Sequence, residues 1–133
     1  MMLLTKASEY ALLSLVLIAR ADNPEDVDTL SRRLGISRSF LAKILQALAR
    51  DEILKSFKGA KGGFALNRPA EEISIRKVIE SAEKKPLSVF ECSSSTKNCS
   101  SGKGEFCIIW PFLNKFQIKI DEFLEEMTLK DIV

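Results

Sequence analysis

The sequence predicts a mainly α-helical protein with one small β-hairpin and a long C-terminal helix. Apolar residues recur at helical spacing through most of the chain, cap residues precede these stretches, and two short apolar runs flank a glycine-rich loop. The 133 residues are 46% hydrophobic and 29% charged, as in ordinary globular domains with a packed core. We therefore expect one domain, or one small domain with an added oligomerisation element.

Two helices are expected in the first third of the chain. Thr5 can cap the first, which runs to about Arg20. The apolar face of this helix consists of Tyr10, Leu13, Val16 and Leu17. The second helix is expected over residues 25–34, with acids in its first turn and arginines in its last, as the helix dipole favours. Gly35 supplies the left-handed residue that ends it.

A third helix begins at Ser37 or Arg38 and ends near Arg50. Its apolar face consists of Leu41, Ile44, Leu45 and Leu48. Because a glycine-containing turn joins it to the preceding helix, the pair is predicted to be a helix-turn-helix. Residues 53–57 and 64–66 are expected to pair as the two strands of a hairpin. A helix-turn-helix followed by a basic hairpin is the winged-helix arrangement.

Two more helices are expected after the wing. Ser74 can cap a helix that ends near Lys84, and Pro111 suits the first turn of the last helix. The sequence thus divides into a winged helix-turn-helix domain (1–84), a cysteine loop (85–108) and a dimerisation helix with a C-terminal tail (109–133). The last helix has little core of its own to cover, so its apolar face is predicted to form a homodimer interface. That face consists of Phe112, Leu113, Phe116, Ile120, Phe123, Leu124 and Met127.

The net charge of +2 conceals an uneven distribution. Residues 29–69 contain nine basic and two acidic residues, a local excess of +7, which predicts a polyanion-binding face. The second helix of a helix-turn-helix fits the DNA major groove, and a basic wing tip suits the minor groove. The predicted contacts to an operator in double-stranded DNA are Ser37, Arg38, Ser39, Ala42, Lys43, Lys58, Gly59 and Lys61. The alternative is a solvated basic face on a protein-interaction adaptor.

Several function classes have no support in the composition. The chain has no histidine, phosphate-binding loop or paired-carboxylate motif, so an enzyme is not expected. The longest apolar run, residues 11–19, is interrupted by Ser14 and is too short to span a bilayer. With an odd number of cysteines, these features predict a cytoplasmic protein with no membrane partner.

The three cysteines of the chain, Cys92, Cys99 and Cys107, lie in one polar stretch rich in serine, lysine and glycine. Thiolates suit zinc or an iron–sulfur cluster. Structural zinc sites usually use tightly spaced cysteine pairs, whereas six and seven residues separate these cysteines. A cluster would need a fourth ligand from an oxygen, a small thiol or a partner chain. The alternative is three free thiols that sense oxidation by forming a disulfide.

With these features together, the chain resembles the IscR/NsrR-type (Rrf-two) family of iron–sulfur winged-helix transcriptional regulators. The resemblance covers nearly the whole sequence and combines a wing motif with three loop cysteines. The matching segments are residues 4–6, 9–11, 36–48, the wing at 59–66, the three cysteines, Trp110 and residues 128–132.

The resemblance implies a homodimeric regulator whose cluster, with two or four irons, is held by Cys92, Cys99 and Cys107. One type of family member adds a histidine, which this chain lacks, and another adds an acid from the first helix of the partner subunit. Glu9 occupies that place, although an acid there also complements the helix dipole. Two features depart from the family pattern: the cysteine gaps are longer than its usual five residues, and Lys58 stands where the family often has arginine.

The sequence therefore predicts a DNA-binding transcriptional regulator that acts as a repressor and is controlled by an iron–sulfur cluster. Redox state, nitric oxide or cluster supply would be the signal. The alternatives are a cluster-free thiol or zinc redox regulator of transcription and, in another class, the protein-interaction adaptor.

Overall fold

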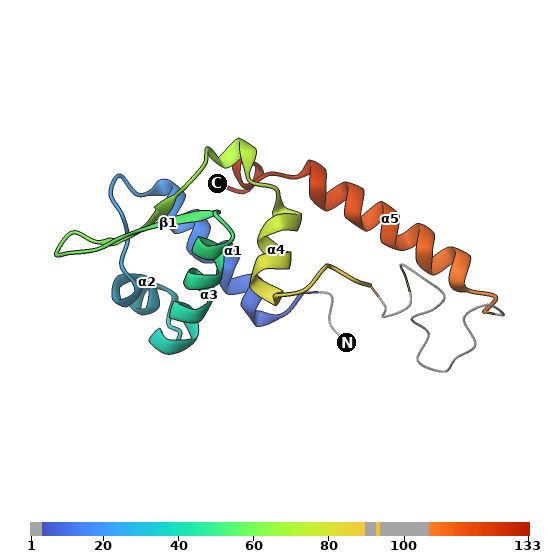
Figure 1. Ribbon diagram of the computed structural model, residues 1–133, viewed down its shortest axis with the longest axis horizontal. Coiled ribbons are helices and arrows are strands. Elements are labelled where there is room, and N and C mark those ends of the chain that lie inside the picture. Colours follow the sequence, from blue (N-terminus) through green and yellow to red (C-terminus); the bar gives the residue numbers. More distant parts are fainter. Residues whose placement is uncertain (1–3, 90–92, 94–106) are drawn as a thin grey trace.

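A computed structural model describes residues 4–89, 93 and 107–133 of the chain. The body of the molecule is a winged helix-turn-helix, and one long helix extends from it (Figure 1). The elements in chain order are α1 (Lys6–Arg20), α2 (Val27–Leu34), α3 (Arg38–Arg50), β1 (Leu54–Phe57), β2 (Gly63–Leu66), the short 3-10 turn η1 (Ala70–Glu72), α4 (Ile75–Glu83), α5 (Trp110–Glu126) and the 3-10 turn η4 (Leu129–Asp131). The predicted fold class is confirmed.

The helix starts follow the cap residues of the sequence. The side chains of Thr5, Ser37 and Ser74 each accept a hydrogen bond from a backbone N–H in the first turn of α1, α3 and α4. Such caps satisfy donors that the helix itself leaves unpaired. Gly35 ends α2 in the left-handed conformation at φ 69°, as predicted.

The predicted start of α2 needs correction, whereas the predicted pairing of the two hairpin strands is confirmed. Helix α2 begins two residues later than expected because Asp26, rather than an earlier residue, caps it through Thr29. Glu25 instead forms a β-bridge with Phe64, through backbone hydrogen bonds of 3.0 and 2.8 Å. Strand β2 of the wing is therefore paired both with β1 and with the loop between α1 and α2.

The core lies between α1, α3 and α4. Leu15 of α1, Leu45 of α3 and Val78 of α4 are fully buried in it, and the predicted apolar face of α3 is buried as expected. The predicted face of α1 is wrong in part. Ala11, Ser14, Leu15 and Ile18 are its central buried residues, whereas Leu13 is exposed and Val16 is only half-buried. The buried face is therefore shifted by one residue, to a line that includes the small residues Ala11 and Ser14, while Tyr10 and Leu17 pack at its edge.

The two ends of α5 have different surroundings. Its C-terminal half packs through Ile120 and Leu124 on the buried cluster of Ile75, Ile79 and Leu87. The chain then returns to the body, where Leu129 is fully buried and donates a backbone hydrogen bond of 2.8 Å to Ile73. The N-terminal half of α5 extends away from the body (Figure 1). Within the part of the chain that the structure describes, no helix has the length and hydropathy needed to cross a membrane.

Candidate nucleic-acid interface and cysteine site

The start of α3 presents polar side chains to solvent. Ser37, Arg38, Ser39 and Lys43 are exposed, and Ala42 is half-buried. The Ser37 hydroxyl is occupied as the cap of α3, because it accepts a hydrogen bond of 3.1 Å from the Phe40 N–H. The Ser39 hydroxyl lies 3.4 Å from that of Ser37, and Lys43 is an exposed cation about one turn further along the helix.

Arg38 is held in a specific orientation by the preceding helix. Its Nε lies 2.5 Å from Oδ1 of Asp28 in α2, and both side chains remain largely exposed. This pair joins the two helices of the helix-turn-helix and compensates the charge of Arg38. An exposed pair contributes little stability, so Arg38 can exchange Asp28 for a phosphate at small cost.

The wing tip carries two exposed lysines, one glycine with open space around it, and two glycines in close contact with backbone. Lys58 and Lys61 are exposed, and a Cβ added to Gly59 would meet nothing within 4 Å, although its φ of +100° suits glycine. A Cβ on Gly63 would lie 2.6 Å from the backbone carbonyl group of Glu25, and one on Gly62 would lie 2.4 Å from the Phe57 carbonyl oxygen. Gly62 and Gly63 therefore serve the close approach of backbone within the wing, and only Gly59 is open to an external ligand.

The wing and α2 lie at one end of the molecule, with α3 beside α2, and the first turn of α5 lies at the other end (Figure 1). The elements that carry the predicted DNA contacts therefore lie at one end of the molecule. The third cysteine lies at the opposite end, because Cys107 comes just before α5 and its carbonyl oxygen accepts a hydrogen bond of 3.4 Å from the Trp110 N–H. Cys107 is half-buried. Cys92 and Cys99 lie outside the described residues.

Ser93, the sequence neighbour of Cys92, is anchored on the same helix. It is fully buried, its hydroxyl donates a hydrogen bond of 2.7 Å to Oε1 of Gln117, and its carbonyl oxygen accepts one of 3.0 Å from Asn114. Asn114 follows Trp110 by four residues, which is about 6 Å along a helix axis. Two described residues of the cysteine loop, Ser93 and Cys107, are thus attached to the first turns of α5.

Sequence reasoning missed Gln117 and Ser93. The available signal was a glutamine four residues after Leu113 on the apolar face of a helix, where a buried polar side chain must find hydrogen-bond partners. Its partners Leu87, Val89 and Ser93 lie 24 to 30 residues earlier in the chain, so they could not be identified without the fold.

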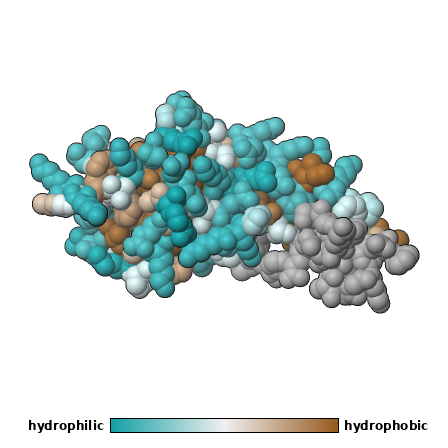
Figure 2. Space-filling model, in the orientation of Figure 1, coloured by the Kyte–Doolittle hydropathy of each residue, from teal (hydrophilic) through white to brown (hydrophobic). Residues whose placement is uncertain are grey.

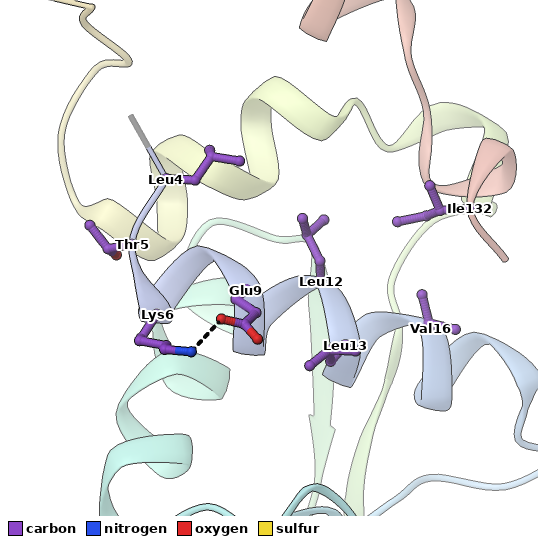
Figure 3. Close-up of a pocket in the computed structure, with 8 residues that line it drawn as sticks. All are labelled: Leu4, Thr5, Lys6, Glu9, Leu12, Leu13, Val16 and Ile132. Atoms are coloured by element: carbon purple, nitrogen blue, oxygen red, sulfur yellow. Dashed lines mark hydrogen bonds and ion pairs between the residues drawn. The ribbon is translucent and has the colours of Figure 1, made fainter. Parts of the chain in front are cut away.

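Glu9 is half-exposed on α1, and its Oε2 lies 3.0 Å from Nζ of Lys6. It borders an apolar groove of about 510 Å³ formed by one side of α1 and by Ile132 from the C-terminal tail (Figure 3). The apolar lining consists of Leu4, Leu12, Leu13, Val16 and Ile132. The carboxylate of Glu9 therefore has a cation on one side and apolar surface on the other.

The beginning of α1 is fixed by a second carboxylate, Glu83 of α4. It accepts hydrogen bonds from the backbone N–H and hydroxyl of Thr5 and from the hydroxyl of Ser8. Burial opposes ionisation of Glu83, but these hydrogen bonds outweigh burial and hold the pKa of Glu83 below its usual value. The helix that carries Glu9 is therefore positioned by a charged residue of α4.

The predicted dimerisation residues divide into two groups. Leu113 is buried within the chain, and Ile120, Leu124 and Met127 pack against the cluster between α4 and α5. Phe112, Phe116 and Phe123 remain 62%, 40% and 59% exposed. Ile109 and Ile118, which the sequence reasoning did not include, are also exposed. Apolar side chains emerge along α5 from an otherwise hydrophilic surface (Figure 2).

No three Cys, Asp or Glu side chains converge on a possible metal site among residues 4–89, 93 and 107–133. This result does not involve Cys92 and Cys99, which fall outside those ranges. The donor chemistry of three thiols, one of them held at the start of a helix, suits an iron–sulfur cluster.

Comparison with known proteins decides the family. The model of the Rrf2 family, described as an iron-dependent transcriptional regulator, matches residues 4–133. The chain belongs to the Rrf2 family. It is 27% identical over 134 aligned positions to the HTH-type transcriptional regulator IscR of Sodalis glossinidius, a match that covers 99% of this chain and 79% of the relative.

Two solved structures of regulators share the fold. CymR, the global cysteine regulator of B. subtilis, superposes with a TM-score of 0.70 at 19% identity, covering 99% of this chain and 96% of CymR. IscR of T. potens superposes with a TM-score of 0.67 at 22% identity, covering 96% of this chain and 83% of that one. This Rrf2 protein is accordingly a transcriptional regulator with a DNA-binding winged helix, and its family is one of regulators rather than enzymes.

Proposed function

We propose that this Rrf2 regulator binds its operator as a homodimer and that an iron–sulfur cluster held by Cys92, Cys99 and Cys107 controls operator binding. The observation that carries the proposal is the attachment of two residues of the cysteine loop, Ser93 and Cys107, to α5. Ser93 contacts Asn114 and Gln117, and Cys107 precedes Trp110 by three residues. The described residues Ser93 and Cys107 thereby lie near the same end of one helix, which supports ligation of one cluster by the cysteines of this loop.

A bound cluster would supply a centre that reacts with oxidants or nitric oxide, or that is lost when iron is scarce. The protein side of the mechanism lies in α5. Its N-terminal end carries the loop, while Ile120 and Leu124 pack against α4, which in turn packs on α3. Ser81 of α4 donates a hydrogen bond of 3.2 Å to the Ala47 carbonyl oxygen of α3. A shift of α5 can therefore be transmitted through its packing on α4 to α3, the predicted recognition helix.

A partner subunit would complete both the interface and the ligand set. The exposed phenylalanines of α5 need a cover, and a second copy offers the apolar groove of α1 as well as the same face of α5. In a single chain, the first turn of α5 lies far from α1 (Figure 1). Glu9 could therefore act as the fourth ligand only if it came from the partner subunit. Its carboxylate would then leave its ion pair with Lys6 to bind the cluster.

The direct test is anaerobic purification with iron and sulfide analysis and an absorption spectrum. The operator can be selected from random-sequence duplexes, and its affinity is then compared between cluster-loaded and cluster-free protein. Stoichiometric iron and sulfide, with a clear difference in affinity, are expected. A colourless protein with one zinc per chain, or equal affinity of both forms, would contradict the proposal.

Glu9 is tested separately. Glu9→Ala is expected to lower cluster content or to speed cluster loss in dioxygen, with Glu71→Ala, an exposed acid of η1, as control. Unchanged content and stability would remove Glu9 as a ligand.

A second candidate is a cluster-free thiol regulator of transcription. The wide cysteine gaps and the structural similarity to CymR favour it. In that case the purified protein would lack iron and sulfide, and oxidation of its thiols would change operator affinity.

A further inference from the structure

One side of α3 is open to solvent, and four residues form a line along it. Ser39, Lys43 and Gln46 are exposed, and Ala42 is half-buried. The opposite side is at most 5% exposed and consists of Leu41, Ile44, Leu45 and Leu48. Residues three, four and seven positions apart share one side of a helix, so residues 39, 42, 43 and 46 form a single exposed face of α3.

The backbone at Gln46 is firmly held, whereas its side chain is free to bind. Its chain neighbours Leu45 and Ala47 are 0% and 3% exposed, and the Ala47 carbonyl oxygen accepts a hydrogen bond of 3.2 Å from Ser81 of α4. Within residues 4–89, 93 and 107–133, the Gln46 amide makes no hydrogen bond. A rigid helix thus presents an unused donor and an unused acceptor, as a precise binding site requires.

Gln46 differs in chemistry from the other three residues of the exposed face. A serine hydroxyl can bond to any base, an alanine can touch a thymine methyl group, and a lysine is a point charge. An amide carries an N–H donor and a carbonyl acceptor side by side. This pair matches N7 and the N6 amino group of adenine in the major groove, so glutamine can bind adenine through two hydrogen bonds.

The position of Gln46 along α3 is compatible with contact to a base. Gln46 follows Ser39 by seven residues, which is about 10 Å along a helix axis. Base pairs are stacked about 3.4 Å apart, so this distance corresponds to about three base pairs. The recognition helix of a homeodomain contacts its site through residues at the same spacing.

We propose that Gln46 is a specificity-determining residue that binds an adenine in each operator half-site. The adenine lies about three base pairs from the position that faces Ser39. This inference rests on the proposed operator binding through α3, and it is independent of the iron–sulfur cluster.

The experiment compares the base preferences of full-length wild type and Gln46→Leu, purified anaerobically and brought to the same cluster state. The operator is selected from random-sequence duplexes with the wild type. Each base pair of one half-site is then replaced in turn, and affinity is measured by fluorescence anisotropy at one salt concentration. One A·T replacement should cost the wild type about tenfold in affinity and Gln46→Leu less than about twofold. Preferences at the other positions should not change.

Two further variants test the chemistry of the contact. Gln46→Glu should prefer cytosine at the same position, because a carboxylate accepts from the cytosine N4 amino group. Glu71→Leu, at an exposed acid of η1, is the control and should keep the wild-type preferences. The slope of log affinity against log salt should be unchanged in Gln46→Leu, since a neutral amide displaces no counterion.

This inference and operator binding fail in different ways. If the wild type selects no sequence, operator binding is contradicted and the inference fails with it. If the wild type selects an operator and Gln46→Leu keeps every base preference, only the role of Gln46 is overturned, and Gln46 is then a surface residue of the helix. An equal loss of affinity for all duplexes also overturns it, because a contact to phosphate or a change in folding affects every sequence alike.

Discussion

The carboxylate of Glu83 accepts a hydrogen bond of 2.6 Å from the hydroxyl of Ser8, a residue 75 positions earlier in the chain. Ser8 is fully buried in the first turn of α1, and Glu83 is the last residue of α4. The same carboxylate oxygen accepts from the backbone N–H of Thr5 at 3.2 Å. Three donors at the start of one helix are thus satisfied by one acid of another, immediately before Glu9.

Replacing Glu83 by alanine should destabilise the protein. It leaves the Ser8 hydroxyl and the Thr5 N–H without their acceptor, so the free energy of unfolding should fall by about 2 kcal/mol. Urea unfolding followed by circular dichroism measures this change. Glu71→Ala, at an exposed acid in η1, should change it by less than about 0.5 kcal/mol. Equal stabilities of the Glu83 variant and the wild type would show that solvent replaces the carboxylate.

The contribution of Glu83 should depend on pH. Its pKa is lower folded than unfolded, so the stabilisation is fully present above the unfolded pKa of about 4.3 and is lost as pH falls through the folded value. The stability difference between wild type and Glu83→Gln, measured in urea from pH 7 to pH 3, should therefore narrow below about pH 4. A difference that stays constant over this range would contradict the charged acceptor.

Substitution of Gly63 should damage the wing. Its φ of +146° is unfavourable for other residues, and an added Cβ would meet the Glu25 carbonyl group. Gly63→Ala should lower the free energy of unfolding by about 2 kcal/mol and weaken operator binding, because the wing would separate from the α1–α2 loop. Ala60→Ser, at an exposed position of the same loop, is the control. Thermal unfolding and fluorescence anisotropy with a labelled operator measure both effects.

Operator binding should lose affinity and salt dependence when exposed lysines are removed from the proposed interface. Lys43→Ala and Lys61→Ala should each reduce the slope of log affinity against log salt by about 0.9 if each lysine neutralises one phosphate. Lys119→Ala, on α5, should leave the slope unchanged. A uniform effect of all three substitutions would place the interface elsewhere.

The exposed phenylalanines of α5 should control the oligomeric state. Phe123→Asp is expected to raise the dimer dissociation constant by at least about tenfold, because it places a charge in an apolar contact. Sedimentation velocity over a concentration series measures this change, with Lys77→Asp, at an exposed lysine of α4, as the control. A wild-type monomer at micromolar concentration would contradict the dimer proposal itself.

Local patterns were sufficient for most secondary structure. The caps Thr5, Ser37 and Ser74 and the helix-ending Gly35 act within one turn of their own position, so a single sequence contains the information. The apolar face of α3 was also predicted correctly, because helical periodicity determines which residues share a side. The division at residues 84 and 108 and the roles of the predicted site residues stay predictions.

Other features depended on partners distant in sequence. The buried face of α1 was predicted from the helical spacing of its apolar residues, yet Ala11 and Ser14 are buried on this helix, which packs against α4 and α3. The bridge between Glu25 and Phe64 delayed the start of α2 for the same kind of reason.

The sequence by itself determined the winged helix-turn-helix, the basic segment and the three cysteines between a wing and a last helix. Only the tertiary structure decided which side of α5 is exposed, how Glu83 holds α1, and that Gln117 binds Leu87, Val89 and Ser93. Helical periodicity and capping operate over a few residues and leave a pattern in the chain. A buried hydrogen bond such as that of Gln117 with Ser93 depends on two distant backbones meeting, and no local pattern specifies that meeting.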